Sequence, residues 1–523
     1  MPPVGAGVKV CRASGTVPDT WHRGPLALTM LTRRCPPRTA LLAIAALLAM
    51  LLIDPPAIAD SESAATGTAA ASSVGGAPFE GFGVSGAWWA RDTGRLPDRV
   101  RARIARLLFA RTGLHLSQYR YNIGGGGAIA TAARFAPGYL RRSGAYDWAA
   151  DPAGRDMLRR AAALGVGHLV AFANAAPPAF TTNGRGCGGS LRSDRVAQYA
   201  AYLARVVSHL SANGTPIALV SPMNEPDSSF SSCNQEGMTV PVSLRARLIQ
   251  AVQAALARRG SAAGVLADES GGAGALLREA PGWLAGAGGS AQPAAVAYHA
   301  YDDPDAGRLD AVRTLADAAA RPAYMSEVCC MVDGHFRRGF HPQMRGALWV
   351  ARAIWRNLAL GGASSFSWWV ALSPELGCDA RQASCRRVSN RSGWDDGLIY
   401  YDRDYRADGS TRLVLTKRYW AYAQFSRWVR PGMRPHVVTG DTGGAKVLVF
   451  AGRGHTVVLA VAPRKRPARF SLQLPWIGSE TAAVSQTSTD RNDAPLRSVG
   501  VNAGVLGADL PKGSVTTFVL PGS

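Results

Sequence analysis

Two glutamates stand directly after apolar, strand-like runs, where carboxylates can do acid–base or nucleophilic chemistry. Glu225 lies in ALVSPMNEP, where Pro222 and Pro226 end the extended run and leave Asn224 and Glu225 at its tip. Glu327 closes the apolar run AYMSE, 102 residues later. Two carboxylates that face one bond can protonate a leaving oxygen and attack the carbon beside it. We predict Glu225 and Glu327 as such a pair, although a lone Glu after a strand is more often a surface or capping residue.

The chain that must position this pair alternates short apolar runs with amphipathic helical patterns. PDRVRARIARLLFARTG and SLRARLIQAVQAALARRG, for example, repeat apolar residues at helical spacing. Eight strand–helix pairs predict an α/β fold, a (β/α)8 TIM barrel over residues 78–430. The expected strands are 81–89, 116–123, 168–173, 217–222, 264–267, 294–298, 323–326 and 364–370.

Polar residues at the ends of the expected strands favour this barrel over an open doubly wound sheet. The C-terminal ends of barrel strands converge on one mouth, which is where active sites lie. Glu225 would end the fourth strand and Glu327 the seventh, so they can face each other at the roughly 5 Å separation of a retaining glycosidase. The other strand ends carry Arg120, Asn174, Asp268, Glu269, His299, Tyr301, Trp368 and Trp369.

The two ends of the chain have a different texture from the barrel. From about residue 431, segments such as KVLVFAGRGHTVVLAVAP alternate with turn residues, which predicts an appended antiparallel β-sandwich over residues 431–523. Residues 60–77, SESAATGTAAASSVGGAP, have too little apolar bulk to fold alone and predict a flexible linker.

Residues 1–59 have the pattern of a secretory signal region. LTRR is followed by an apolar run from Ala40 to Ile53 and by the small-residue sequence AIA before Asp60. The run of about 14 residues is shorter than the roughly 20 that span a bilayer, which disfavours a membrane anchor. We expect a secreted, extracellular protein without an integral membrane span once this region is removed.

Cysteine usage agrees with an oxidising compartment. Two cysteines lie within residues 1–59, and six remain without paired CxxC spacing, so disulfides are favoured over a metal cluster. We expect no metal and no organic cofactor. The expected bonds are Cys378–Cys385 and Cys187–Cys233, and the pairing of Cys329 and Cys330 stays open between core packing and a bond to a neighbouring loop.

The formal charge of +22 raises the question of a nucleic-acid ligand. Residues 1–59 hold six Lys/Arg and two Asp/Glu, so the remaining chain keeps +18. Its arginines are scattered along helices and do not cluster, which indicates a solvated basic surface. We expect no nucleic-acid partner, although such a field favours anionic or acidic glycan surfaces.

A series of short motifs resembles glycoside hydrolase family 30 over residues 79–523. GFGVSGAWW, YRYNIGGG, SPMNEP, AYHAYD, YMSEV, SFSWWV and DGLIYYD occur in the order of that family's landmarks. The stretch Gly124–Gly127 and DGLIYYD are most similar to its endo-β-1,6-galactanase branch. The resemblance implies a retaining endo-β-1,6-galactanase, acting as a monomer on β-1,6-galactan or arabinogalactan side chains.

The resemblance also implies roles for the polar residues at the mouth. Glu225 would be the acid/base and Glu327 the nucleophile of a double displacement. Asn224 would bond the sugar 2-hydroxyl, where hydrogen bonds tighten in the transition state. Arg120 would keep Glu327 ionised, because a nearby cation favours a carboxylate.

Three further residues are expected in the substrate site. Tyr301 would orient the nucleophile, and Trp368 would offer a flat apolar face to a sugar ring. His299 is expected there too, with a purely structural role as the alternative, and Trp368 or Trp369 could instead be barrel packing. Gly124–Gly127 is not a phosphate loop, because no Gly-Lys-Ser/Thr follows it, and would allow close backbone approach near the cleft.

Two other readings of the chain stay open at this point. Substrate choice lies in loops, so another family 30 activity, such as a β-1,6-glucanase, a glucosylceramidase-like enzyme or a xylanase, is an alternative. A non-catalytic carbohydrate-binding protein is the second, and the presence of both carboxylates and Asn224 argues against it.

Overall fold

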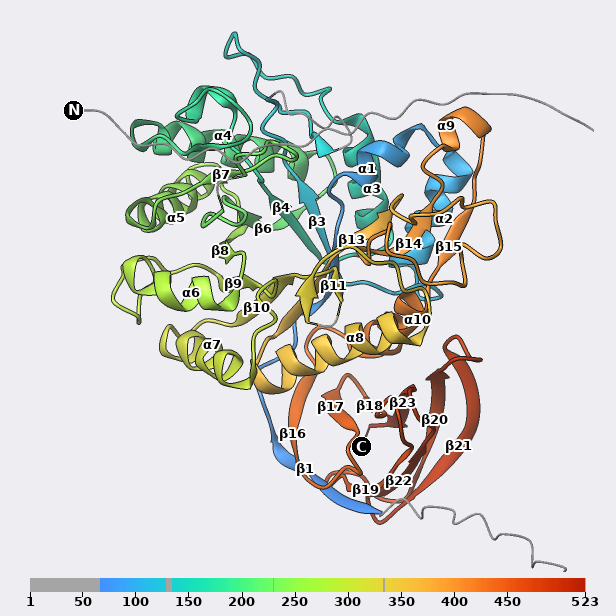
Figure 1. The fold of residues 1–523 in the computed structure, drawn as a ribbon. Helices are drawn as coiled ribbons and strands as arrows, with labels where there is room; N and C mark the ends of the chain where they lie inside the picture. The colour runs from blue at the N-terminus through green and yellow to red at the C-terminus, as the bar shows by residue number, and fades with distance from the viewer. Residues whose placement is uncertain (1–65, 128–133, 229, 333, 523) are drawn as a thin grey trace, which may run out of the picture. The chain divides into compact units, whose positions relative to one another are not determined.

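Eight parallel strands pair side by side and close into a barrel, as the sequence predicts (Figure 1). The computed structural model describes residues 66–127, 134–228, 230–332 and 334–522. The ring closes because β13 pairs with both β10 and β2. In ring order the strands are β2 (Gly81–Ser85), β3 (Gln118–Asn122), β4 (His168–Phe172), β6 (Ile217–Ser221), β8 (Gly264–Ser270), β9 (Ala295–His299), β10 (Ala323–Glu327) and β13 (Ser365–Ser373).

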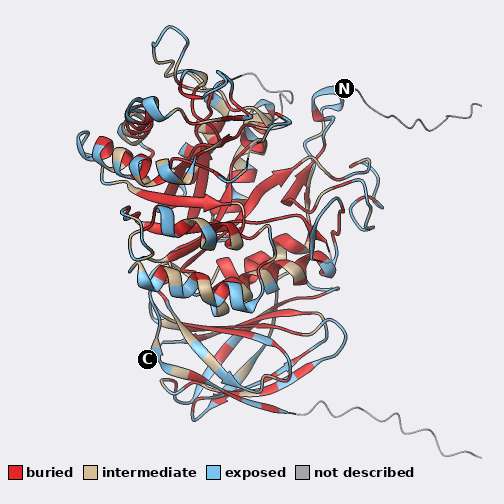
Figure 2. Cartoon of the chain, turned by 60° about the vertical axis from the view of Figure 1, so that its left-hand side comes forward, coloured by how far each residue is buried: buried red, intermediate tan, exposed pale blue. Residues whose placement is uncertain are grey.

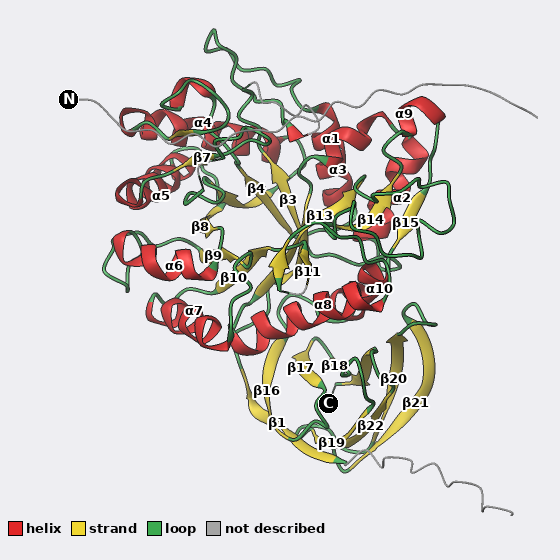
Figure 3. Cartoon of the chain, viewed as in Figure 1, coloured by secondary structure: helices red, strands yellow, loops and turns green. Residues whose placement is uncertain are grey.

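Helices follow the barrel strands and surround the sheet (Figure 3). The apolar stripe read from the sequence of α2 is buried at Val100, Ile104 and Leu108. The start of α3 is set by Asp151, whose carboxylate accepts the amide of Gly154. The helices are α2 (Asp98–Phe109), α3 (Pro152–Ala163), α4 (Val196–Ala212), α5 (Val242–Ala257), α6 (Ala273–Glu279), α7 (Ala306–Ala318), α8 (Met344–Trp355) and α10 (Lys417–Ser426), with short turns at α1 (Trp89–Asp92) and α9 (Tyr405–Asp408).

The barrel strands are buried almost throughout, while the helices are buried on one side only (Figure 2). Parallel strands covered by helices need apolar residues on both faces, which explains their continuous apolar sequence. One cluster of apolar side chains from neighbouring strands includes Val170, Leu219, Leu266, Ala297 and Tyr324. A packed sheet of this kind holds the strand ends, and the polar residues on them, in fixed positions.

Short strands decorate the barrel and its loops. The sheet continues beyond β13 into β14 (Gly397–Tyr401) and β15 (Leu413–Leu415). Two small ribbons pair β5 (Gly189–Ser190) with β7 (Met238–Thr239), and β11 (Met331–Val332) with β12 (His335–Phe336). The second ribbon follows directly after β10, the strand that ends in Glu327.

The C-terminal strands form the separate, mainly antiparallel β-region that the sequence predicts. Its hydrogen-bonded order is β16, β17, β18, β23, β20, β21, β22 and β19, and β1 closes this ring between β19 and β16. Only the β1–β19 pair is parallel. The strands are β1 (Gly67–Gly75), β16 (Arg434–Gly440), β17 (Lys446–Gly452), β18 (His455–Val461), β19 (Ala468–Gln473), β20 (Glu480–Thr487), β21 (Ala494–Asn502), β22 (Val505–Leu510) and β23 (Val515–Pro521).

Strand β1 differs from the flexible linker expected over residues 60–77. Its backbone pairs with β16 on one side and β19 on the other, and Ala69 and Ala71 are buried. A segment too poor in apolar bulk to fold alone is ordered here because two strands distant in sequence supply its hydrogen bonds. The signal region expected at 1–59 and residues 60–65 of the expected linker lie outside the described residues.

Three disulfides link the six cysteines of the described chain. Cys187 bonds Cys233 and Cys378 bonds Cys385, which confirms both expected pairs. Cys329 and Cys330 bond each other, an arrangement that differs from the neighbouring-loop bond considered from the sequence. Among the helices of the described residues, none combines the length and apolar character needed to cross a membrane.

Candidate active site

Glu225 and Glu327 lie at the same end of the barrel, after β6 and at the last position of β10. Pro222 ends β6, and the chain turns so that Glu225 adopts φ 45°, a left-handed conformation rare for a residue with a side chain. Its amide donates to the carbonyl of Glu269 at 3.0 Å, which ties this turn to the end of β8. The two prolines around Asn224 and Glu225 thus end a strand and set up a fixed turn.

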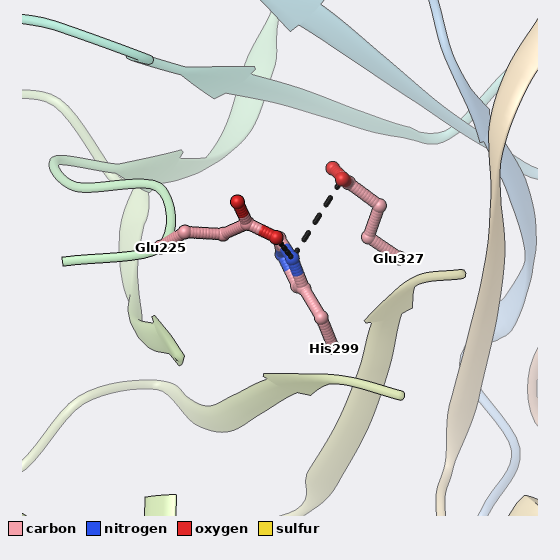
Figure 4. A group of neighbouring side chains, drawn as sticks. All are labelled: Glu225, His299 and Glu327. Carbon is pink, nitrogen blue, oxygen red and sulfur yellow. Dashed lines mark hydrogen bonds and ion pairs between the residues drawn. The ribbon is translucent and has the colours of Figure 1, made fainter. Parts of the chain in front are cut away.

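The two carboxylates approach each other across His299, the last residue of β9. Figure 4 shows the imidazole between them, and carboxylate oxygens of both glutamates and a ring nitrogen of His299 lie within 4.8 Å of one another. His299 Nδ1 is 3.1 Å from Glu225 Oε1 and 3.6 Å from Glu327 Oε1. The ends of β6, β9 and β10 therefore bring two acids and one base to a single point.

Burial and charge act against each other on these groups. Burial raises the pKa of Glu327, and His299 and Arg120 oppose it without cancelling it, so this pKa lies above its usual value. Burial by itself lowers the pKa of His299, but the carboxylates of Glu327 and Glu225 outweigh it and the pKa is raised. Because both pKa values are raised, Glu327 and His299 each hold a proton more tightly than the isolated side chain would.

Arg120, at the centre of β3, joins two carboxylates and is 1% exposed. Its guanidinium donates to Glu327 Oε2 at 2.7 Å and to Glu269 Oε1 at 2.8 Å. The sequence placed Glu269 at a strand end but assigned it no role. Its other oxygen accepts the hydroxyl of Ser221, so Glu269 is a fully bonded carboxylate that balances the buried arginine.

Asn224 and Tyr301 contact the same group of residues. The Asn224 side-chain oxygen lies 3.4 Å from a guanidinium nitrogen of Arg120. The hydroxyl of Tyr301 donates to Glu327 Oε1 at 3.0 Å. Because Arg120 occupies Oε2 and Tyr301 occupies Oε1, both oxygens of Glu327 have a hydrogen-bond donor that fixes the carboxylate plane.

A cavity of about 740 Å³ opens at these carboxylates. This volume lies within the roughly 300–1,000 Å³ range of ligand pockets. Aromatic rings, charged groups and the Cys329–Cys330 disulfide share its wall. Residues along it include Trp88, Arg134, Asn224, Glu225, Asp227, Arg278, Tyr301, Asp302, Glu327, Cys329, Cys330, Phe336, Trp369, Trp394 and Asp396.

Trp368, expected to face a sugar ring, does not line this cavity. Its ring is fully buried, packs at 5.8 Å from that of Trp349 on α8, and donates its indole N–H to the carbonyl of Asp396 at 2.5 Å. The next residue, Trp369, lines the cavity and meets Trp88 edge-on at 4.9 Å. Neighbouring residues of a strand point to opposite faces, so the sequence located the pair but not the member that faces the cleft.

Gly124–Gly127 makes the close backbone approach expected of it. A Cβ on Gly124 would lie 2.0 Å from the carbonyl oxygen of Ala136, so a larger residue does not fit. The amide of Gly125 donates to the buried carboxyl of Glu236 at 3.1 Å. Burial raises the pKa of Glu236 to about 8, although backbone amides, Gly125 first, act in the opposite direction. No motif in the sequence marks Glu236, which lies in the loop that follows Cys233.

Among the described residues, Glu225, His299 and Glu327 are also the group whose ligand atoms lie close enough to hold a metal ion. Both oxygens of Glu327 already accept bonds from Arg120 and Tyr301, and His299 Nδ1 pairs with Glu225. The atoms that could bind a metal ion are therefore already hydrogen-bonded or ion-paired within the protein.

Comparisons with known proteins agree with this geometry. Residues 77–281 match the family model described as O-Glycosyl hydrolase family 30. The chain is 24% identical over 494 residues to an endo-beta-1,6-galactanase of Hypocrea rufa, covering 85% of this chain and 92% of that protein.

Two solved structures share the fold. A conserved exported protein from Bacteroides fragilis superposes with a TM-score of 0.72 at 20% identity, covering 86% of this chain and 100% of the other. The catalytic domain of the GH30 xylanase C from Talaromyces cellulolyticus superposes with a TM-score of 0.67 at 20% identity, covering 87% and 99%. The resemblance read from the sequence motifs is thereby confirmed.

Proposed function

We propose that this chain, a glycoside hydrolase of family 30, cleaves internal β-1,6-galactosidic linkages with retention of configuration. The observation that carries the proposal is the pair Glu225 and Glu327, whose carboxylate oxygens lie within 4.8 Å across His299. Retaining glycosidases use carboxyl groups about 5–5.5 Å apart, whereas inverting enzymes need roughly 6.5–9.5 Å to admit a water molecule. The short separation supports a double displacement.

In the first half of this mechanism, Glu327 attacks the anomeric carbon and Glu225 protonates the departing oxygen. Arg120 and Tyr301 hold the two oxygens of Glu327, so the attacking lone pair has a fixed direction. Asn224 bonds the sugar 2-hydroxyl, while its own oxygen stays within reach of Arg120. The covalent glycosyl ester forms as the glycosidic bond breaks.

In the second half, Glu225 takes a proton from water, and the water opens the ester at the anomeric carbon. Two inversions give net retention. His299, bonded to Glu225 and charged more readily than a free imidazole, is the positioning residue that holds the acid/base during both proton transfers. Glu269 acts one step further back, by fixing Arg120.

Substrate class is supported by sequence similarity and by charge. The relative from Hypocrea rufa is an endo-beta-1,6-galactanase that aligns with most of both chains. Side chains of arabinogalactan carry β-1,6-linked galactose, and the chain beyond residue 59 keeps a charge of +18, which favours acidic glycans. Three disulfides support action outside the cytosol, where we propose that the enzyme acts as a monomer.

A panel of linkage-defined glycans tests the proposal. De-arabinosylated β-1,6-galactan should be cut internally to short oligomers, whereas β-1,3-galactan, xylan and β-1,6-glucan should stay largely intact. Proton NMR during the first minutes should show new reducing ends in the β configuration.

Two outcomes would refute separate parts of the proposal. Faster attack on β-1,6-glucan than on β-1,6-galactan would reject the galactanase assignment and leave the two-carboxylate mechanism. New reducing ends in the α configuration would reject the double displacement itself.

A further inference from the structure

The segment directly after the nucleophile strand has a construction that the proposed mechanism does not use. Cys329, two residues beyond Glu327, is joined to Cys330 by a disulfide, and both cysteines line the cavity. The chain then forms the ribbon β11–β12, in which Met331 pairs with Phe336. The amide of Arg337 donates to the carbonyl of Cys330 at 3.2 Å, so the ribbon returns to the disulfide and is closed there.

This disulfide contributes to local geometry more than to overall stability. A cross-link stabilises a fold chiefly by closing a long loop of the unfolded chain, and adjacent cysteines close almost none. Cys330 has φ 63°, a left-handed conformation that residues with side chains seldom adopt. The bond to Cys329 keeps the backbone in this conformation, and the conformation sets the direction in which β11 leaves the strand.

The ribbon carries an exposed aromatic ring into the cavity. Phe336 is 55% exposed and lines the same cavity as Glu225 and Glu327. Its ring lies 5.4 Å from that of Tyr301 and 5.5 Å from that of Trp394. A large apolar ring left in water at a cavity wall favours a ligand that covers it.

One carboxyl oxygen without a hydrogen-bond partner in the described part of the chain lies in the same wall. Asp396 is 7% exposed, two residues beyond Trp394, and its Oδ1 has no hydrogen-bond partner among the described residues. A buried acceptor of this kind is unfavourable until a ligand donates to it. Aromatic surface beside a buried carboxylate oxygen suits a pyranose, which has apolar C–H faces and hydroxyl donors around its rim.

The contacts also place this wall one residue away from the nucleophile. Tyr301 bonds Glu327 through its hydroxyl and meets Phe336 through its ring, so Tyr301 lies between the nucleophile and Phe336. The sugar that Glu327 attacks therefore occupies the near side of Tyr301. A ring stacked on Phe336 belongs to another unit of the same glycan chain.

We propose that Phe336, Trp394 and Asp396 form a subsite for a sugar unit next to the one attacked, and that the Cys329–Cys330 disulfide is the positioning element that holds Phe336 in it. The inference rests on the proposed function, since it takes the occupant to be a glycan chain. It does not depend on the galactose assignment, because stacking and a carboxylate acceptor serve any pyranose.

The test compares a chain substrate with a substrate too short to reach the subsite. The chain substrate is a tetrasaccharide of whichever linkage the wild-type enzyme cleaves fastest in the glycan panel. The short one is the matching β-glycosyl fluoride, used as the monoglycoside because its leaving group is a single atom that cannot reach the subsite. Phe336→Ala should raise KM for the tetrasaccharide about tenfold, and by at least fivefold more than for the monoglycoside. Phe336→Trp should restore most of the tetrasaccharide KM, because it returns the ring.

The positioning role of the disulfide is tested by Cys329→Ala/Cys330→Ala. This double variant should raise the tetrasaccharide KM in the same direction as Phe336→Ala, and adding Phe336→Ala to it should have little further effect. Cys378→Ala/Cys385→Ala removes a disulfide away from the cavity and is the matched control. Val437→Ala, at another exposed apolar residue (68% exposed), controls for loss of surface bulk.

Binding gives a readout that does not depend on turnover. Calorimetry of the tetrasaccharide with Glu327→Gln, with and without Phe336→Ala, should show about a tenfold weaker Kd when the ring is absent. An unchanged KM and Kd in Phe336→Ala, or equal losses on both substrates, would overturn the subsite. If the wild-type enzyme cleaves glucan but not galactan, the galactanase proposal is rejected and this test still applies. If it neither cleaves nor binds any glycan, both the galactanase proposal and the subsite are rejected.

Discussion

Glu236 offers the sharpest quantitative test of the structure around the cleft, through Glu236→Gln. Its carboxyl is 1% exposed beneath Gly124–Gly127, and burial raises its pKa from 4.5 to about 8. Between these two pH values the folded protein keeps one proton that the unfolded chain releases. The contribution of Glu236 to the free energy of unfolding is therefore full below pH 4.5 and is lost progressively as the pH rises to about 8.

The magnitude follows from the size of the pKa shift. Each pH unit within this window changes the free energy of unfolding by about 1.4 kcal/mol, so pH 5 to pH 8 removes roughly 4 kcal/mol. Glutamine cannot ionise and removes this dependence. Its oxygen can keep the bond from the amide of Gly125, but its N–H₂ then faces the side-chain amide of Asn122. This mismatch costs about 1–3 kcal/mol at every pH. The free energy of unfolding of the variant, relative to that of the wild type, should thus increase as the pH rises.

Urea unfolding at pH 5, 6, 7 and 8 measures this difference. The wild-type free energy of unfolding, relative to that of Glu236→Gln, should fall by about 1.4 kcal/mol for each unit. Glu480→Gln is the matched control, because Glu480 is exposed on β20 and meets water in both states. Parallel curves for the wild type and Glu236→Gln would refute the reasoning, since they would mean that the amides around Gly125 keep Glu236 ionised in the folded protein.

Five further substitutions test the proposed site. Glu327→Gln should fold normally and lose about 10³-fold or more of kcat. A slow fluorinated glycoside should label Glu327 in the wild type, and labelling of another residue would reject Glu327 as the nucleophile. Glu225→Ala should nearly stop on substrates with poor leaving groups, while azide should restore turnover of activated aryl glycosides; equal losses without rescue would give Glu225 another role. Tyr301→Phe should lower kcat roughly tenfold and move the acid limb of the kcat/KM pH profile to higher pH. The reason is that loss of the donated hydrogen bond raises the pKa of Glu327 further. An acid limb at the wild-type pH would contradict this role of Tyr301. Trp369→Ala should raise KM with little change in stability, whereas Trp368→Ala should lower the free energy of unfolding by about 3–5 kcal/mol. A raised KM in Trp368→Ala and a loss of stability in Trp369→Ala would instead agree with the prediction from the sequence that Trp368 faces the sugar.

Local chemistry in the sequence was enough to predict the barrel. Apolar runs bounded by prolines and polar residues mark strands wherever they occur, and helical spacing between them marks the covering layer. All eight expected strands are present, and Glu225 and Glu327 meet because the ends of parallel barrel strands have only one place to converge. The pairings Cys187–Cys233 and Cys378–Cys385 followed from the same local reasoning.

Sequence patterns were therefore enough to identify the set of elements and the end of the barrel at which the proposed chemistry lies. Tertiary structure alone decided which partners the elements find. It ordered β1 between two distant strands, paired Glu269 with Arg120, and turned Trp369 and not Trp368 towards the cleft. Each of these outcomes depends on hydrogen bonds or packing between residues far apart in the chain, or on the rotation of a strand about its own axis, and local composition and spacing carry no record of either.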